Sequence, residues 1–599
     1  MAGGSPRRTR AAARAQEGST DGSPSPAASM DDGSGGGGRR RLLALVAALL
    51  GWRACVYVVE RAQEERSKIK SIEDVPETAM DLLRRLNWTS AVEEHLESMV
   101  QPSARVSAEA PKHPLVLVPG IISCGLELWR PGACFGKRFF RERLWGGLGM
   151  ARTAMANISC WLDHVSLDPS TGLDKEGQAV RAALGWAGAD YFAPGYWLWS
   201  KLLSNAAALG YDRSTMHVAC YDWRLSFRNL ERRDQFLTRL KAEVEILAAA
   251  HDKVVVVGHS MGATLVTFFL SWCELGDPGW TDRHVHAVVS LGGSLLGAVG
   301  PLGAVLSGEM KATAMLGMLN ELIDSQLSFL NKTRQRDIYR SLGAMGALLP
   351  KGGDALWGDD LVSVRTAGAG EADEAEEATF GFDAIRAALA AELPDGASIL
   401  DYDPRPRWPS LRPRVGAGAA ERLAAASENP LNAPLPAAPN LTFYCLYGTR
   451  VPTEIRYRYA RDGAPPTAAE LGTIDYALDD GTYESGVENG DGDGTVPLLS
   501  LGYPCAGLWR DAELAPEFNP ARAKTVVREY PHDACPVWQD PRGGVRTSKH
   551  VDILGNFDVI ADILSVATGG GDLEDRVDSD ILGVAAEASA RLRTALGER

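Results

Sequence analysis

Four short apolar runs lie along the middle of the chain, and glycine or proline directly follows three of them. Runs of this length that end in turn residues are typical of buried strands. Apolar residues also recur at helical spacing over 263–275 and in a later stretch that ends at Val566. Strands that alternate with helices favour an α/β fold whose mostly parallel sheet is covered on both faces. The strand-like runs are residues 115–118, 254–257, 287–291 and 441–446.

The flanking and inserted segments lack this alternation. Residues 1–38 are rich in Gly, Ser, Pro and Arg and cannot bury enough apolar surface to fold, so we expect a disordered tail. Residues 359–438 combine Ala, Glu, Asp, Pro and Gly with few aromatic residues, which predicts a largely solvated, disordered insertion with one Ala-rich helix. We therefore expect one globular domain over 111–570, after a linker over 61–110 and before a helical tail over 571–599.

Residues 39–60 have the pattern of a membrane anchor. Leu42 to Val59 are mostly apolar, with one interruption at Arg53, and eighteen helical residues rise about 27 Å, close to the thickness of a bilayer core. Residues 1–41 carry seven Arg against four acidic residues, which favours a cytosolic N-terminus. Because no small-residue cleavage site is evident, we expect a single retained transmembrane helix that exports the remainder of the chain.

This topology predicts a location in the endoplasmic reticulum membrane, with the globular domain in the oxidising lumen. The alternative is a chloroplast membrane, because the first 16 residues are rich in Arg and free of acids, as in transit peptides. Four Asn-x-Ser/Thr sequons add weak support for export. They begin at Asn87, Asn157, Asn331 and Asn440.

Composition and charge narrow the class of function. The net charge of −15 over 599 residues argues against a nucleic-acid-binding protein, because phosphate backbones are bound by concentrated Lys and Arg. The chain has no zinc-type Cys/His spacing and no glycine-rich phosphate loop followed by Lys-Ser/Thr. We therefore expect chemistry that uses no metal, no nucleotide and no other cofactor.

The sequence Gly258-His259-Ser260-Met261-Gly262 directly follows the valine strand and opens a helical stretch. This strand–turn–helix setting is that of the nucleophile elbow of an α/β-hydrolase fold, in which glycines on both sides permit a strained turn that exposes the serine hydroxyl. A short Gly-x-Ser-x-Gly motif also arises by chance, but a buried structural serine does not need both glycines. Ser260 is thus the predicted nucleophile.

A serine nucleophile needs a histidine base and a carboxylate that orients it, in the chain order Ser, acid, His for this fold. His284 and His286 precede a strand and look structural, and His532 lies in a predicted loop. His550 begins a loop-to-helix junction near the end of the domain and is the favoured base. For the acid, Asp491 and Asp493 share a glycine-rich turn that could equally bind calcium or merely bend the chain. The residues alone do not choose between them.

The oxyanion hole needs two backbone N–H groups aimed at the developing negative charge. One is expected from Met261, the residue after the nucleophile. The other is expected from the loop after the first strand, where Ile121 follows Pro119-Gly120.

Many segments, in order along residues 110–567, resemble the lecithin:cholesterol acyltransferase family. Collinear matches of this kind are far more specific than one short motif, although the insertion over 359–438 does not align with the family. They include Leu126-Glu-Leu-Trp129, Arg143-Leu-Trp-Gly-Gly147, Asp190-Tyr-Phe-Ala-Pro-Gly-Tyr196, Tyr221-Asp-Trp-Arg-Leu-Ser-Phe227, Leu349-Pro-Lys-Gly-Gly-Asp354, Asp493-Gly-Thr-Val-Pro497 and His550-Val-Asp-Ile553.

The resemblance implies an α/β-hydrolase fold with cap or lid insertions, a triad of Ser260, Asp493 and His550, and oxyanion amides from Ile121 and Met261. It also implies transfer of a fatty acyl group from a phospholipid to diacylglycerol without acyl-CoA. Hydrolysis of membrane lipids by the same triad, as in a phospholipase or galactolipase, is the alternative, and a non-catalytic lipid-binding protein is a third. Finally, it implies two disulfide bonds, Cys134–Cys160 and Cys445–Cys505, with the other five cysteines free.

Overall fold

The structure is a computed structural model that describes the chain from residue 101 onward, with gaps. The expected tail, the anchor over 39–60 and nearly all of the linker lie outside the described residues. No helix within the described part is both long and apolar enough to cross a bilayer. The described residues are 101–106, 111–193, 195–309, 332–367, 376–409, 418–462, 468, 471–536, 540–570 and 573–597.

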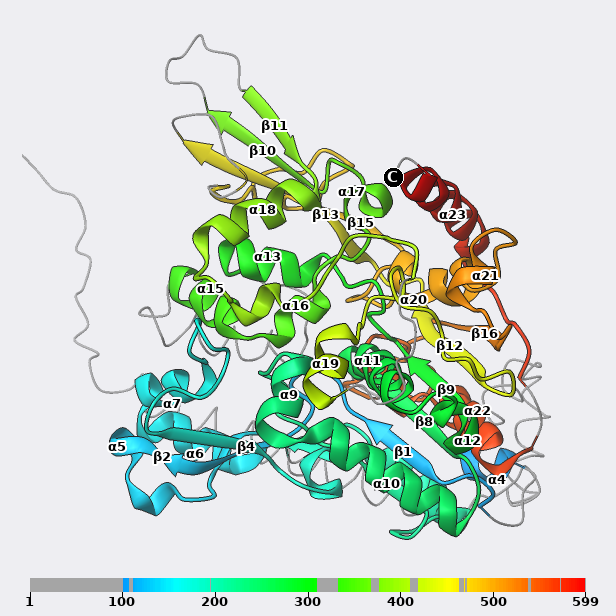
Figure 1. Ribbon diagram of the computed structural model, residues 1–599. Helices are drawn as coiled ribbons and strands as arrows, with labels where there is room; N and C mark the ends of the chain where they lie inside the picture. Colours follow the sequence, from blue (N-terminus) through cyan, green and yellow to red (C-terminus); the bar gives the residue numbers. More distant parts are fainter. Residues whose placement is uncertain are drawn as a thin grey trace, which may run out of the picture. The chain divides into compact units, whose positions relative to one another are not determined.

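A six-stranded parallel sheet forms the centre of the fold, in the order β16-β12-β9-β8-β1-β7 (Figure 1). The four predicted apolar runs lie in β1, β8, β9 and β12, and two further strands complete the sheet at its edges. Nearly every side chain of the four inner strands is buried, as expected when helices cover both faces. The strands are β1 (Leu115–Val118), β7 (Met216–Val218), β8 (Val254–His259), β9 (Val285–Leu291), β12 (Thr442–Thr449) and β16 (Lys524–Pro531).

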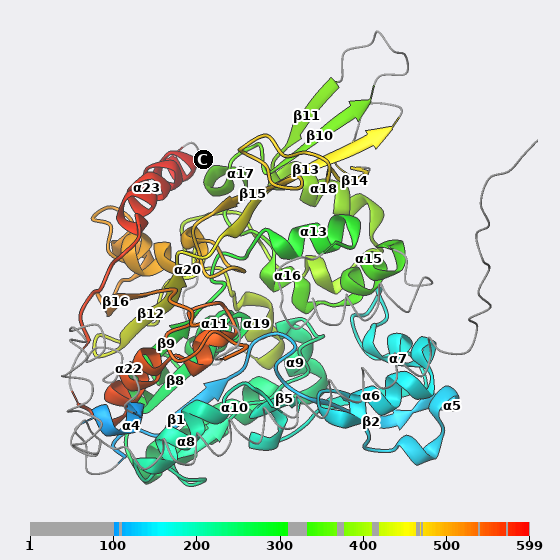
Figure 2. The ribbon, with the colours of Figure 1, turned by 180° about the vertical axis from the view of Figure 1, so that it is seen from behind.

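Helices cover the two faces of this sheet, which together with its parallel strands makes an α/β-hydrolase-like fold. Helices α10 (Phe236–Ala250), α11 (Met261–Gly276) and α12 (Trp280–His284) lie on the face seen in Figure 1. Helices α8 (Ser200–Ala208) and α22 (Phe557–Thr568) lie on the opposite face (Figure 2). Helix α11 is apolar nearly all round because α19 (Ala419–Ala425) packs on its outer side.

Residues 126–182 form a separate small layer, which we call the antiparallel lobe. Its strands β2 (Leu126–Pro131), β3 (Arg143–Trp145) and β4 (Gln178–Ala182) make a three-stranded antiparallel sheet. The Cys134–Cys160 disulfide links its first helix to its last. The hairpin of β5 (Tyr191–Ala193) and β6 (Tyr196–Trp197) follows it in the chain. The helices of the lobe are α5 (Gly132–Phe135), η2 (Lys137–Phe139), α6 (Gly147–Ala156) and α7 (Ile158–Val165).

The expectation of a disordered insertion over 359–438 is wrong for the described part of that stretch. Strand β10 (Val362–Ala367) pairs in parallel with β13 (Thr453–Asp462), and helix α18 (Phe382–Glu392) buries Phe382, Ile385 and Leu389. Composition is a poor guide here, because one of the two strands that pair with β10 is β13, far along the chain, and the burial that β13 provides is not visible in the local sequence. The same sheet contains β11 (Glu376–Phe380), β14 (Thr473–Ile474) and β15 (Val487–Gly490).

The C-terminal segment is a helix that belongs to the domain. Helix α23 (Ile581–Gly597) packs on α20 (Leu498–Tyr503) and on η5 (Pro504–Leu508), and it buries Ile581, Leu592 and Leu596. One carboxylate oxygen of the fully buried Glu529, Oε2, accepts hydrogen bonds from the backbone N–H groups of Asp578 and Ser579, which precede α23. The segment is therefore anchored and does not form a separate tail.

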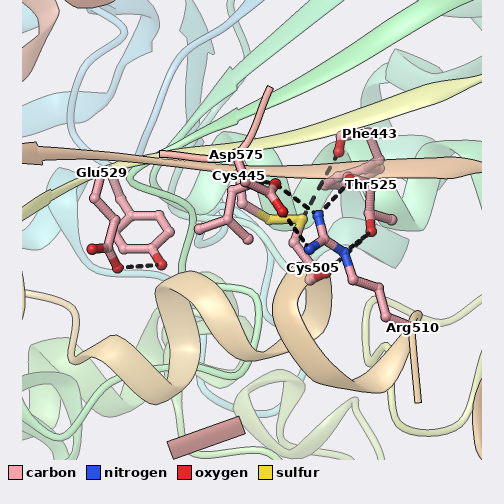
Figure 3. The surroundings of a disulfide bond; sticks show 9 residues. Phe443, Cys445, Cys505, Arg510, Thr525, Glu529 and Asp575 are labelled. Carbon is pink, nitrogen blue, oxygen red and sulfur yellow. Dashed lines mark hydrogen bonds and ion pairs between the residues drawn. A yellow bond between two sulfur atoms is a disulfide. The ribbon is translucent and has the colours of Figure 1, made fainter. Parts of the chain in front are cut away.

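The Cys445–Cys505 disulfide joins the inner strand β12 to η5, next to the edge strand β16 (Figure 3). Arg510 lies next to it and donates to both carboxylate oxygens of Asp575 and to the hydroxyl of Thr525 (Figure 3). Both cysteines are fully buried. The remaining described elements are α4 (Pro102–Arg105), η3 (Trp186–Gly188), α9 (Phe227–Asp234), α13 (Gly300–Ser307), α15 (Lys332–Ser341), α16 (Ala344–Leu348), α17 (Gly353–Trp357), η4 (Ser398–Leu400), α21 (Ala515–Phe518) and η6 (Asp552–Gly555).

Candidate active site

Ser260 lies at the sharp turn between β8 and α11. Its φ of 57° and ψ of −128° are a strained conformation for a residue with a side chain. A β-carbon on Gly258 would lie 2.6 Å from the α-carbon of Ala263, and one on Gly262 would lie 2.2 Å from the carbonyl oxygen of Val118. Both glycines are therefore required by the close packing of the turn, which is the geometry of a nucleophile elbow.

Three side chains from distant parts of the sequence form a hydrogen-bonded chain at the carboxyl ends of the strands. Nε2 of His550 is 2.8 Å from Oγ of Ser260, and Nδ1 of His550 is 2.7 Å from Oδ2 of Asp493. Because a carboxylate only accepts, Nδ1 carries the proton and the bare Nε2 accepts from the serine hydroxyl. Ser260, Asp493 and His550 are 6%, 0% and 6% exposed. This is the arrangement of a Ser-His-Asp triad.

The structure distinguishes the two carboxylates of the glycine-rich turn. The second oxygen of Asp493 accepts from the N–H groups of Thr495 and Val496, at 3.0 Å and 2.8 Å, so the whole carboxylate is held. Asp491 is exposed, and its carboxylate instead accepts from the N–H groups of Arg450 and Gly492. Of the two carboxylates, only that of Asp493 bonds to His550, and that of Asp491 stabilises the turn through backbone N–H groups.

The other candidate histidines lie away from Ser260. Nδ1 of His532 accepts from the N–H of Ser548 at 3.1 Å. A ring nitrogen of His284 bonds to the carbonyl of Trp280 in its own helix. The ring of His286 is stacked on that of His113 at 3.9 Å, near the amino end of β1. None of the three takes part in the hydrogen-bonded chain.

The loop after β1 approaches the nucleophile closely. A β-carbon on Gly120 would lie 2.9 Å from the β-carbon of Ser260, so only glycine fits there. The hydroxyl of the buried Tyr221 donates to the carbonyl of Pro119 at 2.8 Å and holds the start of this loop. Ile121 follows directly, and Met261 is the first residue of α11. Their role as oxyanion donors remains a prediction.

A metal site is not supported by the clusters that the described residues form. Only one group of three potential ligands lies close enough together, and it consists of Cys134, Cys160 and His164. The two sulfurs are joined in the lobe disulfide and are not available as thiolates. Of the other five cysteines, Cys124, Cys220, Cys273 and Cys535 take part in neither disulfide, and Cys55 lies outside the described residues.

Comparison with known proteins places these residues in a family. The model of the lecithin:cholesterol acyltransferase family matches residues 139–373 and 419–557, which include Ser260, Asp493 and His550. The chain belongs to the lecithin:cholesterol acyltransferase family.

Members of this family named as phospholipid:diacylglycerol acyltransferases are similar to the chain over most of its length. That of Schizosaccharomyces pombe is 36% identical over 493 residues, which cover 78% of this chain and 75% of the relative. That of Saccharomyces cerevisiae is 35% identical over 77% of this chain and 71% of the relative. Phospholipid:diacylglycerol acyltransferase 1 of Arabidopsis thaliana is 34% identical over 78% of this chain and 83% of the relative.

Two residues at the site of this family member were missed from the sequence. His259 bonds through Nε2 to the backbone carbonyl of His550 at 2.8 Å. The guanidinium group of Arg542 lies 3.6 Å above the ring of Trp197 and pairs with Asp552, two residues after the base. For His259, the only signal in the sequence is its place directly before the predicted nucleophile in Gly258-His259-Ser260. No local pattern marks the second, because its aromatic partners Tyr196 and Trp197 are hundreds of residues away.

Proposed function

We propose that this protein transfers a fatty acyl group from a phospholipid to diacylglycerol and forms triacylglycerol and lysophospholipid. The observation that carries the proposal is the hydrogen-bonded chain of Ser260, His550 and Asp493 in a member of this family. The names of the relatives, and their identity of about one third over most of their length, support phospholipid as the donor and diacylglycerol as the acceptor.

In the first half-reaction, Oγ of Ser260 attacks the carbonyl carbon of a phospholipid ester while its proton passes to Nε2 of His550. The tetrahedral oxyanion is stabilised by backbone N–H groups, for which Ile121 and Met261 are the candidates. Asp493 holds the imidazolium in place. The intermediate then collapses, the ester C–O bond breaks, and the lysophospholipid oxygen leaves with the proton from Nε2.

In the second half-reaction, the hydroxyl of diacylglycerol gives its proton to Nε2 of His550 and attacks the acyl-Ser260 ester. Collapse of the second tetrahedral intermediate forms triacylglycerol and returns the proton to Ser260. The only difference from a lipase is the acceptor, since water in the place of diacylglycerol yields a free fatty acid.

A membrane location fits both lipid substrates. We extend the proposal to a single transmembrane helix over 39–60, with a cytosolic N-terminus and the catalytic domain in the lumen of the endoplasmic reticulum, the chloroplast membrane being the alternative. Large apolar side chains on the antiparallel lobe support contact with lipid, because Trp129, Phe140 and Met155 are 47%, 55% and 82% exposed. Protease protection of the domain in sealed microsomes tests the topology. Digestion without detergent would refute it.

The activity is tested with purified full-length protein, phospholipid labelled in its acyl chain, and diacylglycerol. We expect labelled triacylglycerol in the wild type and none with Ser260→Ala. Label recovered only as free fatty acid would make the protein a lipase. Equal lipid products from the wild type and from Ser260→Ala would support the non-catalytic alternative.

A further inference from the structure

His259, the residue before the nucleophile, ends β8 and is 2% exposed. Its Nε2 lies 2.8 Å from the backbone carbonyl oxygen of His550. A carbonyl only accepts, so Nε2 of His259 carries the proton and donates it, and Nδ1 is bare. The tautomer of this second histidine is therefore set by the catalytic base.

The backbone of His550 is held from two directions. Its N–H donates to the carbonyl of Asp493 at 2.8 Å, and its own carbonyl accepts from His259. The two imidazole rings also contact each other, with centroids 5.1 Å apart. A base whose backbone and ring are both restrained keeps its Nε2 at hydrogen-bonding distance from Ser260.

The other edge of the His259 ring faces the loop after β1. A β-carbon on Gly120 would lie 3.2 Å from Nδ1 of His259. This nitrogen is buried and has no hydrogen-bond partner among the residues that the structure describes. The His259 ring thus contacts both the loop that carries His550 and the loop after β1, which is expected to supply an oxyanion donor. His259 is also the direct chain neighbour of the nucleophile Ser260.

Burial, together with a smaller effect of the neighbouring His550, lowers the pKa of His259 to about 3. The ring is therefore neutral at the pH at which a histidine base works. When His550 becomes protonated during catalysis, the neutral His259 adds no like-charge repulsion, and its N–H continues to hold the carbonyl.

We infer that His259 is a positioning residue that acts through His550: its Nε2–H bond to the His550 carbonyl holds the base in line with Ser260 and Asp493. The inference rests on the proposed serine nucleophile and adds a fourth side chain to its geometry. The competing account is that His259 only fills space. Substitutions of His259 that keep or remove a hydrogen-bond donor at similar size distinguish the two accounts.

The test uses full-length protein with His259→Gln, His259→Met and His259→Phe. The amide nitrogen of Gln reaches the place of Nε2 and can donate, Met has similar length without a donor, and Phe keeps a ring without a donor. The rate constant for labelling of Ser260 by a fluorophosphonate probe measures nucleophile activation without any lipid interface. Steady-state kcat and KM with phospholipid and diacylglycerol, and the thermal unfolding midpoint, complete the measurements.

We expect labelling and kcat to fall at least tenfold in the Met and Phe variants, with KM within twofold and an unchanged unfolding midpoint, and Gln to restore most of the rate. His113→Phe is the matched control, since His113 is equally buried but stacks on His286 at the amino end of β1. It should label within twofold of the wild type.

Met or Phe variants that label at the wild-type rate would overturn the inference, as would a folded Gln variant that is as slow as Met. If Phe does not fold, the Gln and Met pair still decides the question. Absence of labelling in the wild type would instead refute the serine nucleophile, so the two failures are distinguishable.

Discussion

The carboxyl edge of the parallel sheet and the antiparallel lobe differ in how far they expose the side chains that matter most to each. At the sheet edge, Ser260, Asp493 and His550 are each no more than 6% exposed and every polar atom of the triad has a partner. In the lobe, large apolar side chains such as Phe140 and Met155 are more than half exposed.

A cluster of buried charges joins the lobe to the main domain, beside apolar contacts such as that of Trp145 with Trp223. The fully buried Arg224 donates to the carboxylates of Asp222 and Asp174 and to the carbonyl of His164, and the last two residues belong to the lobe. Burial alone would raise the pKa of Asp222, but Arg224 and Arg233 outweigh it and hold the pKa well below its usual 3.8. The comparison shows that the catalytic side chains at the sheet edge are enclosed and hydrogen-bonded, whereas the lobe joins the hydrophobic core and also exposes several large apolar side chains to solvent.

The largest expected effect separates the two carboxylates at the sheet edge. Asp493→Asn removes the acceptor that sets the His550 tautomer and should lower kcat by about four orders of magnitude. Asp491→Asn, the matched control two residues away, should change kcat less than threefold. Steady-state kinetics with phospholipid and diacylglycerol measure both. The reverse result would reassign the acid.

Removing each disulfide compares the stability of the two regions. The sequence separations of 60 and 26 residues predict losses of about 4.3 and about 3.5 kcal/mol from loop entropy alone. We expect Cys445→Ala/Cys505→Ala to lower the global unfolding midpoint. Cys134→Ala/Cys160→Ala should instead expose the lobe to proteolysis, with the global midpoint nearly unchanged. A lobe variant with the larger global loss would contradict the comparison.

Acid should affect the two regions in different pH ranges. The folded pKa of His259 is about 3 against 6.5 for an ordinary histidine, so the unfolded chain binds a proton first and stability falls as pH drops below 6.5. This contribution amounts to about 2 kcal/mol between pH 7 and pH 5. Asp222 has a lowered pKa, so its contribution is intact until the pH falls below about 3.8.

Urea unfolding at pH 7 and pH 5 measures this difference. His259→Phe should lose about 2 kcal/mol less than the wild type on going to pH 5, since Phe cannot be protonated. Asp222→Asn should have the same dependence as the wild type over this range. Identical pH dependence for the wild type and His259→Phe would show that His259 is not held neutral by burial.

The smallest expected effect concerns the contact between the His550 loop and the β5–β6 hairpin. The Arg542 guanidinium stacks 3.6 Å above Trp197 and 4.2 Å from the Tyr196 ring. Arg542→Lys keeps the charge but not the planar stacking, and should lower kcat three- to tenfold, which corresponds to about 1 kcal/mol.

The control for this substitution is Arg152→Lys in the lobe. Arg152 also combines an aromatic contact, 5.7 Å from the Phe139 ring, with an ion pair to Glu142. Both of these contacts are to residues of the lobe, so kcat should be unchanged. Equal losses in both variants would mean that Arg542 has no special link to the base.

Much of the sheet could be predicted because its inner strands are continuous apolar runs. Residues 115–118, 254–257 and 287–291 lie in β1, β8 and β9, and the helix expected over 263–275 is α11. The edge strands β7 and β16 were missed, since their apolar residues are interleaved with polar ones. Strands β10 and β11 were missed as well, because β10 joins their hairpin to the sheet through β13, which is distant in the chain.

By itself, the sequence determined the nucleophile elbow, because the valine strand, the two glycines and the serine are neighbours and a local turn follows from local residues. It also determined that a histidine and a carboxylate had to follow. The family resemblance favoured Asp493 over Asp491, but only the tertiary structure placed the Asp493 carboxylate against His550, the His259 ring against the His550 carbonyl and Trp197 against Arg542. Hydrogen bonds across more than fifty residues depend on how β12, β15 and β16 are arranged, and no local pattern of residues contains that information.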